Sequence, residues 1–179
     1  MTLEERLEKI YEGHARKPFV AADRDLKTWL LNPKPVPKIN MEEVEDGLLA
    51  GDIILLWRVG FGTFTTESVF PKYFEYTYGI DAPAHLLSLL EGGYVVKESA
   101  MESLDHLSAP VKKGILKLHG ATGLSKLKAA QVDDLIRDLL SEADLSQEMD
   151  IRGYCLTDKG RAMLENHPEV IARHPQKKF

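Results

Sequence analysis

Five lysines lie close together near the middle of the chain, and their side chains could bind phosphate groups. They are Lys112, Lys113, Lys117, Lys126 and Lys128. Ammonium groups neutralise the phosphates of a nucleic-acid backbone, and such contacts carry no information about base sequence. No neighbouring side chain suits a bidentate contact with a base edge, so we expect binding that is only weakly sequence-specific. These five lysines are therefore the predicted binding residues, with nucleic acid, DNA in preference to RNA, as the predicted partner.

The sequence shows no pattern for catalysis, for a metal ion or for a cofactor. Its histidines are His14, His85, His106, His119, His167 and His174. There is no HExxH motif and no Gly-x-Ser-x-Gly motif, and no metal-ligand spacing surrounds Cys155. We expect His85 and His106 to be packed or hydrogen-bonded rather than ligands. The adjacent Asp133 and Asp134 would diverge by about 100° on a helix, which predicts a solvated face rather than a carboxylate pair. We therefore expect a binding protein and not an enzyme.

Two short helices must position the lysines. Ser108 is predicted to cap the first helix, Pro110 lies in its first turn, and Gly120 is predicted to end it. The predicted apolar face of this helix consists of Val111, Ile115 and Leu118. The second helix is predicted from the recurrence of Val132, Leu135, Ile136 and Leu139 at i, i+3, i+4 and i+7. The segment GATGLSKL between them is expected to be extended, with the start of the second helix contributing free N–H groups to phosphate binding.

This stretch resembles the SAP-type helix-extended-helix family and the N-terminal module of transcription terminator Rho. The matching residues are Leu104, Leu107, Lys113–Leu116, Gly120, Gly123–Lys128 and Leu135–Ile136. The resemblance implies binding to a DNA or RNA backbone. In that family basic residues usually stand directly before the Leu-Ile pair, whereas this chain has Gln131-Val132-Asp133-Asp134 at that place.

The rest of the chain predicts a mainly α-helical, winged-helix-like domain into which this module is inserted. Helices are expected at 40–58, capped by Asn40, and at 67–78 and 81–91, with strands at 94–98 and 151–156 and a helix capped by Thr157. The strand, Leu-Thr and Lys-Gly helix resemble the closing wing of winged-helix proteins. The predicted domains are 40–99 with 150–179, the SAP-like module 100–149, and an N-terminal segment 1–39. The fragments FPKYFEYTYGI, RGYCLTDKG and ARHPQKK resemble an uncharacterised family of bacterial and phage-associated SAP-domain proteins.

The N-terminal segment 1–39 is expected to contain two helices, at 2–12 with a Thr2–Glu5 capping box and at 22–31. The run NPKPVPK cannot be helical and is predicted to be a linker or a surface strap, with a polyproline ligand as the alternative. The aromatic residues of 64–78 are expected to form core, with a base-stacking platform as the alternative.

Composition separates two functional hypotheses. The net charge is −5, so no global basic field attracts nucleic acid, whereas the lysine cluster gives a local positive excess. The single cysteine, Cys155, allows no internal disulfide and fits a reducing cytoplasm. We expect no signal peptide and no membrane anchor, since the charged N-terminus MTLEERLEKI suits neither. The lysines favour a nucleic-acid-binding accessory protein, and the acidic remainder favours a protein-interaction adaptor.

Overall fold

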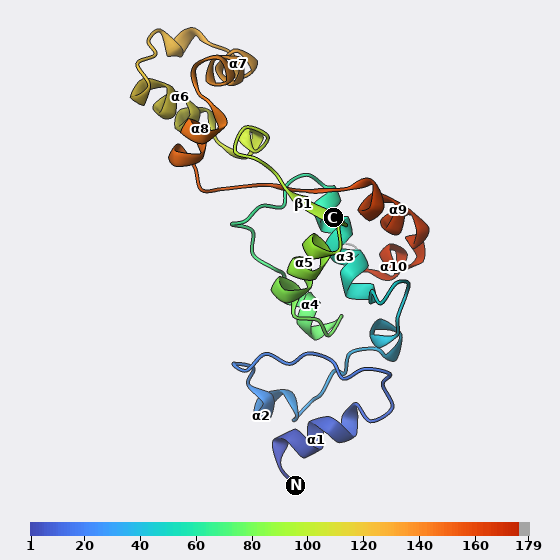
Figure 1. Cartoon of the computed structure of the whole chain (residues 1–179). Helices are drawn as coiled ribbons and strands as arrows, with labels where there is room; N and C mark the ends of the chain where they lie inside the picture. The colour runs from blue at the N-terminus through green and yellow to red at the C-terminus, as the bar shows by residue number, and fades with distance from the viewer. Residues whose placement is uncertain (176–179) are drawn as a thin grey trace. The chain divides into compact units, whose positions relative to one another are not determined.

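The computed structural model of the chain describes residues 1–175 and is mainly helical, with one small two-stranded antiparallel sheet (Figure 1). The α-helices are α1 (Leu3–Ile10), α2 (Leu26–Trp29), α3 (Ala50–Gly60), α4 (Tyr73–Tyr76), α5 (Ala82–Glu91), α6 (Ala109–Leu118), α7 (Ala129–Leu139), α8 (Glu142–Glu148), α9 (Asp158–Asn166) and α10 (Pro168–Arg173). The 3-10 helices are η1 (Lys38–Met41), η2 (Leu104–His106) and η3 (Leu124–Lys126), and the strands are β1 (Val95–Lys97) and β2 (Tyr154–Leu156). The last three residues of the ARHPQKK fragment, 176–178, lie outside the described residues.

The chain divides into two compact units. Unit 1 contains Met1–Gly60, Val69–Val95 and the chain from Leu156, and unit 2 contains Phe61–Ser68 and Val96–Cys155. Unit 2 therefore includes the segment predicted as the SAP-like module, together with the loop after α3. Residues 1–39 belong to the same unit as α3.

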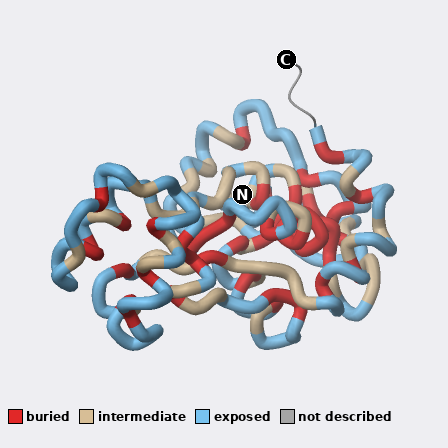
Figure 2. The backbone as a smooth tube through the Cα atoms, turned by 90° about the horizontal axis from the view of Figure 1, so that it is seen from above, coloured by how far each residue is buried: buried red, intermediate tan, exposed pale blue. Residues whose placement is uncertain are grey.

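Helix α3 is the centre of unit 1. Every residue from Ala50 to Leu56 is buried, a run drawn red in Figure 2, and α3 packs against η1, α5, α9 and α10. The prediction that this helix begins at Asn40 is wrong. Asp46 and Gly47 both adopt positive φ, 50° and 79°, and turn the chain sharply between Glu45 and Leu48. An Asp-Gly pair favours this turn, so the helix cannot start before it.

The N-terminal segment of unit 1 is held by local caps and by a proline strap. The capping box between Thr2 and Glu5 at the start of α1 is confirmed. The proline run lies as a strap, in which Val36 is buried and its N–H donates to the Tyr11 hydroxyl at 3.1 Å. Helix α2 is shorter than the predicted helix 22–31, because Asp25 is its N-cap and accepts a hydrogen bond from the Thr28 N–H.

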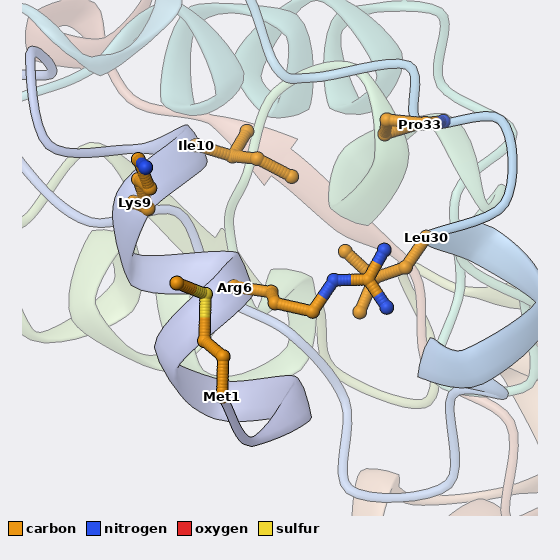
Figure 3. Close-up of a pocket in the computed structure, with 6 residues that line it drawn as sticks. All are labelled: Met1, Arg6, Lys9, Ile10, Leu30 and Pro33. Atoms are coloured by element: carbon orange, nitrogen blue, oxygen red, sulfur yellow. The ribbon is translucent and has the colours of Figure 1, made fainter.

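A pocket of about 410 Å³ lies beside α1 in unit 1 (Figure 3). Its lining residues are Met1, Arg6, Lys9, Ile10, Leu30 and Pro33. Figure 3 shows the Arg6 side chain extended from α1 toward Leu30, with Ile10 and Pro33 across the opening. No side chain with a carboxylate or a hydroxyl group is among these lining residues.

Two aromatic residues of the predicted helix 67–78, Phe74 and Tyr78, form core, whereas Phe70 and Tyr73 are half-buried and Tyr76 is 38% exposed. Only Tyr73–Tyr76 is helical, and Phe74 and Tyr78 are almost fully buried. The Tyr78 hydroxyl lies 2.6 Å from Nδ1 of His174, and burial raises the pKa of Tyr78 to about 12. Burial, assisted by the Arg58 charge, lowers the pKa of His174. These rings are therefore committed to packing inside unit 1.

The two predicted strands pair with each other, which confirms the predicted sheet. The Glu98 N–H donates to the Gly153 carbonyl at 2.9 Å, and the Thr157 N–H donates to the Tyr94 carbonyl at 3.1 Å. Thr157 caps α9 as predicted. A Cβ atom at Gly160 would lie 2.0 Å from the Tyr94 carbonyl oxygen, so only glycine allows α9 to approach the backbone this closely.

Candidate nucleic-acid interface

Unit 2 contains the two predicted helices, but the segment between them, predicted to be extended, includes the 3-10 helix η3. Ser108 occupies the cap position of α6 with an extended backbone, although its hydroxyl makes no capping bond, and Pro110 lies in the first turn. Gly120 and Gly123 adopt left-handed φ values of 85° and 70°, which end α6 and redirect the chain into η3. The predicted limits of the first helix are confirmed.

Helices α6 and α7 pack against each other and contribute four of the buried residues of a small apolar core. Its buried members are Ala100, Leu104, Ile115, Leu116, Leu124, Val132, Ile136, Leu140, Leu145 and Met149. On α7 the predicted stripe is present at Val132 and Ile136, whereas Leu135 is only partly buried and Leu139 is 49% exposed. The second helix therefore buries a narrower face than its sequence pattern predicts.

The predicted apolar face of α6 is right at Ile115 and wrong at Val111 and Leu118. Val111 and Leu118 are 49% and 76% exposed, whereas the buried residues are Lys112, Ile115 and Leu116. Each residue advances about 100° around the helix axis, so the buried side of α6 is rotated by about one residue from the side that the apolar pattern indicates. The prediction failed because Lys112 lies on the buried face, whereas the apolar pattern placed this lysine on the solvent-exposed face.

Lys112 is not available to bind phosphate. It is 8% exposed, and its Nζ lies 2.7 Å from Asp133 Oδ1 on α7. The prediction that Asp133 belongs to a solvated face is therefore wrong, whereas Asp134 is exposed and lies near Arg137. Burying an ammonium group is costly unless a carboxylate compensates its charge, and Asp133 supplies that carboxylate from the neighbouring helix.

Lys113 and Lys117 lie one turn apart on α6 and share one groove. The groove has a volume of about 380 Å³, and its other lining residues are Ala121, Thr122, Gly123, Leu124 and Ser125. Within residues 1–175 neither lysine makes an ion pair. The groove thus combines two ammonium groups with the hydroxyls of Thr122 and Ser125, a set of donors that can bind a phosphate-sized anion.

Lys126 and Lys128 are both exposed and lie at the entry to α7. Lys128 occupies the N-cap position, where its own N–H donates to Gln131 Oε1 at 2.8 Å. A lysine side chain cannot accept the following N–H groups, so α7 begins without the side-chain cap that serine or aspartate would supply. The first amides and the positive end of the helix dipole therefore add to the charge of the two lysines.

Of the five predicted lysines, three are exposed, Lys113 is half-buried and Lys112 is buried, and the groove itself was not predicted. Thr122 and Ser125 line the groove beside Lys113 and Lys117. The sequence signal for the groove is the segment GATGLS. Gly123 adopts left-handed φ between Thr122 and Ser125, and both hydroxyl residues line the groove beside α6.

The two histidines singled out from the sequence differ in the structure. Nδ1 of His85 lies 2.7 Å from Oδ1 of the buried Asp52, and this hydrogen bond raises the pKa of His85. That prediction is confirmed. His106 is packed, but its Nε2 lies beside the carboxylates of Glu98 and Asp105. These three residues are a possible set of metal ligands that the sequence analysis did not predict.

Comparisons with family models, with curated proteins and with solved structures found no match to this chain. None of the helices formed by residues 1–175 has the length and apolar character needed to cross a lipid bilayer.

Proposed function

We propose that this protein binds the phosphate backbone of nucleic acid through unit 2, as a weakly sequence-specific accessory protein without catalytic activity. The binding surface consists of Lys113 and Lys117 in the groove, with Lys126 and Lys128 at the entry to α7. Lys112 is excluded from this surface by its ion pair with Asp133. DNA is the preferred partner.

One observation carries the proposal. Lys113 and Lys117 line a single polar groove, and neither ammonium group is neutralised by a carboxylate among the described residues. Where this chain buries a lysine, at Lys112, it supplies a carboxylate. A pair of uncompensated lysines, Lys117 exposed and Lys113 half-buried, beside hydroxyl groups is therefore a surface suited to an external anion.

The proposed class of fold is a winged-helix-like domain that carries an inserted SAP-type helix-extended-helix module. The order α3, α4, α5, β1, β2, α9 supports the first part, since the two strands pair and a helix follows them. The order α6, η3, α7 between the strands supports the second part.

The proposal is tested with the full-length chain and short duplex DNA, single-stranded DNA and RNA of matched length. We expect binding at low salt and a linear fall of log affinity with log salt concentration, with the highest affinity for DNA. Permuting the base sequence should change the affinity little. Failure to bind all three nucleic acids at low salt would contradict the proposal.

A protein-interaction adaptor is the second candidate, and one surface of α6 favours it. Val111, Gly114 and Leu118 are all exposed and recur at i, i+3 and i+7, on a different side of the helix from Lys113 and Lys117. An exposed apolar stripe of this kind suits a partner helix. Binding assays distinguish the two candidates, because substitutions in the stripe should leave nucleic-acid affinity unchanged.

A further inference from the structure

A second group of polar side chains meets in unit 2 beside the end of β1. Glu98 follows the strand, and Asp105 and His106 come from η2. Nε2 of His106 lies 4.0 Å from Glu98 Oε1 and 3.7 Å from Asp105 Oδ1. One potential ligand atom from each residue lies within 4.8 Å of the other two.

The His106 side chain is directed into this group and has no hydrogen-bond partner there. Only 9% of the side chain is exposed, and Nε2 is buried without a hydrogen bond among the described residues. Burying a polar atom without a hydrogen bond is unfavourable. Nε2 therefore faces the carboxylates in a position where an additional atom could bind it.

Gly153 provides the space in front of these atoms. A Cβ atom at this position would lie 2.5 Å from both Glu98 Oε1 and His106 Nε2. The Gly153 backbone is fixed by a hydrogen bond from its N–H to the Ser103 hydroxyl at 3.0 Å, and it forms a β-bridge with Thr65. Its φ is not left-handed, so glycine is required here for space rather than for conformation.

We propose that Glu98, Asp105 and His106 bind a divalent transition-metal ion of the zinc class in the space beside Gly153. One imidazole nitrogen and two carboxylate oxygens are ligands that Zn²⁺ accepts, whereas Mg²⁺ and Ca²⁺ prefer sites made of oxygen alone. Three protein ligands leave a coordination position open for water or for another ligand.

The observed distances require only a small contraction around the ion. Bond lengths near 2.0–2.1 Å in a tetrahedral zinc site separate neighbouring ligand atoms by about 3.3 Å. Asp105 can move closer, because its side chain is 69% exposed. Burial and the nearby carboxylates of Asp105 and Glu102 raise the pKa of Glu98, and a bound cation would relieve that repulsion.

The competing interpretation is that protonated His106 simply forms an ion pair with the two carboxylates. Both interpretations need glycine at position 153, because a Cβ atom there would lie 2.5 Å from Glu98 Oε1 and from His106 Nε2. They differ in the response to added Zn²⁺, because an ion pair alone would neither bind the ion nor gain stability from it.

The test uses the full-length chain, stripped with a chelator and titrated with ZnCl₂ by calorimetry and by thermal melting. We expect one Zn²⁺ per chain, a higher melting temperature with Zn²⁺, and no competition from excess Mg²⁺. Loss of one hydrogen-bond partner of a ligand weakens metal affinity about 10–100-fold, so loss of a ligand in His106→Gln should weaken it by at least about 100-fold.

Two matched pairs of variants locate the ion. Gly153→Ala should abolish binding by filling the site, whereas Gly114→Ala, which meets no atom within 4 Å, should not change it. His167, which lies near Glu45 and Glu169, is the control for His106, and His167→Gln should retain binding. If Gly153→Ala does not fold, His106→Gln decides the question. The proposal is wrong if the unaltered chain binds no Zn²⁺, or if His106→Gln binds it as tightly as His167→Gln does.

Discussion

The two units treat their charged side chains differently. In unit 1 three pairs of polar groups meet in the interior: Asp52 with His85, Arg24 with Glu75, and Tyr78 with His174. In unit 2 Lys112 is paired in the same way with Asp133, whereas Lys113 and Lys117 beside it line a groove. Neighbouring lysines of one helix therefore have different surroundings.

The two units also differ in how far their helices are buried. Helix α3 is buried on all sides over Ala50–Leu56, whereas α6 and α7 each bury one face and leave the other exposed. Unit 1 thus surrounds its central helix with other elements, whereas unit 2 leaves one face of α6 and one face of α7 exposed. The following predictions test this contrast, from the largest expected effect to the smallest.

Leu55→Ala in α3 should cause the largest loss of stability. Leu55 is fully buried in the best-packed helix, so the cavity left by truncation cannot easily collapse. We expect a loss of about 3–5 kcal/mol in the free energy of unfolding, measured by urea denaturation. A loss below about 1 kcal/mol would show that α3 is not the rigid centre of unit 1.

Ile136→Ala should be the most damaging single truncation in α7. Ile136 is fully buried in the core of unit 2, and we expect a loss of about 2–4 kcal/mol. Leu139, which is 49% exposed, is the matched control, and Leu139→Ala should cost less than about 1 kcal/mol. Equal losses for the two variants would contradict the one-sided burial of this helix.

Asp133→Ala should destabilise unit 2, whereas Lys112→Met should not. Removing the carboxylate leaves a buried ammonium group without compensation, at a cost of about 1–3 kcal/mol given the partial exposure of Asp133. Replacing Lys112 with methionine retains the volume and removes the charge, and such replacements are often nearly neutral. Lys112→Met should also leave nucleic-acid affinity intact. Chemical denaturation measures the first effect and a binding titration the second.

Two histidines of unit 1, His85 and His174, should make the stability of the protein depend on pH, by small amounts and in opposite directions. The hydrogen bond to Asp52 raises the pKa of His85, so its contribution is present at low pH and is lost as the pH rises through the folded-state pKa. Burial lowers the pKa of His174, so its contribution is present above pH about 6.5 and is lost as the pH falls.

Melting curves between pH 5 and pH 8 can separate these two contributions. The stability advantage of the unaltered chain over His85→Gln should shrink as the pH rises, and its advantage over His174→Gln should shrink as the pH falls. Differences of the same sign for both variants would contradict the assigned pKa directions.

Local signals predicted much of this fold. The caps at Thr2 and Thr157 were predicted from a few neighbouring residues, because a cap depends only on groups within one turn. The pairing of β1 with β2 followed because a lone strand would leave its backbone groups without partners. The start of α3 was missed, because the apolar pattern outweighed the turn signal at Asp46-Gly47.

The sequence predicted the lysines of the candidate site correctly only where no partner on another helix buries the side chain. Lys113, Lys117, Lys126 and Lys128 face solvent or the groove, whereas Lys112 is buried because a carboxylate on another helix reaches it. No local pattern encodes such a partner. The meeting of Glu98 with His106 depends likewise on β1, η2 and the space at Gly153, which come together only in the folded chain.

The salt dependence of nucleic-acid binding in a charge-matched pair of double variants tests the central claim most directly. Lys113→Ala with Lys117→Ala removes the groove lysines, and Lys27→Ala with Lys34→Ala removes two exposed lysines of unit 1. Each lost contact with duplex DNA reduces the slope of log affinity against log salt by about 0.9, so the groove variant should lose nearly two units of slope together with affinity. The control variant should keep both, and both melting temperatures should stay close to that of the unaltered chain. If the two variants lose affinity and slope equally, the groove is not the site where the protein binds phosphate.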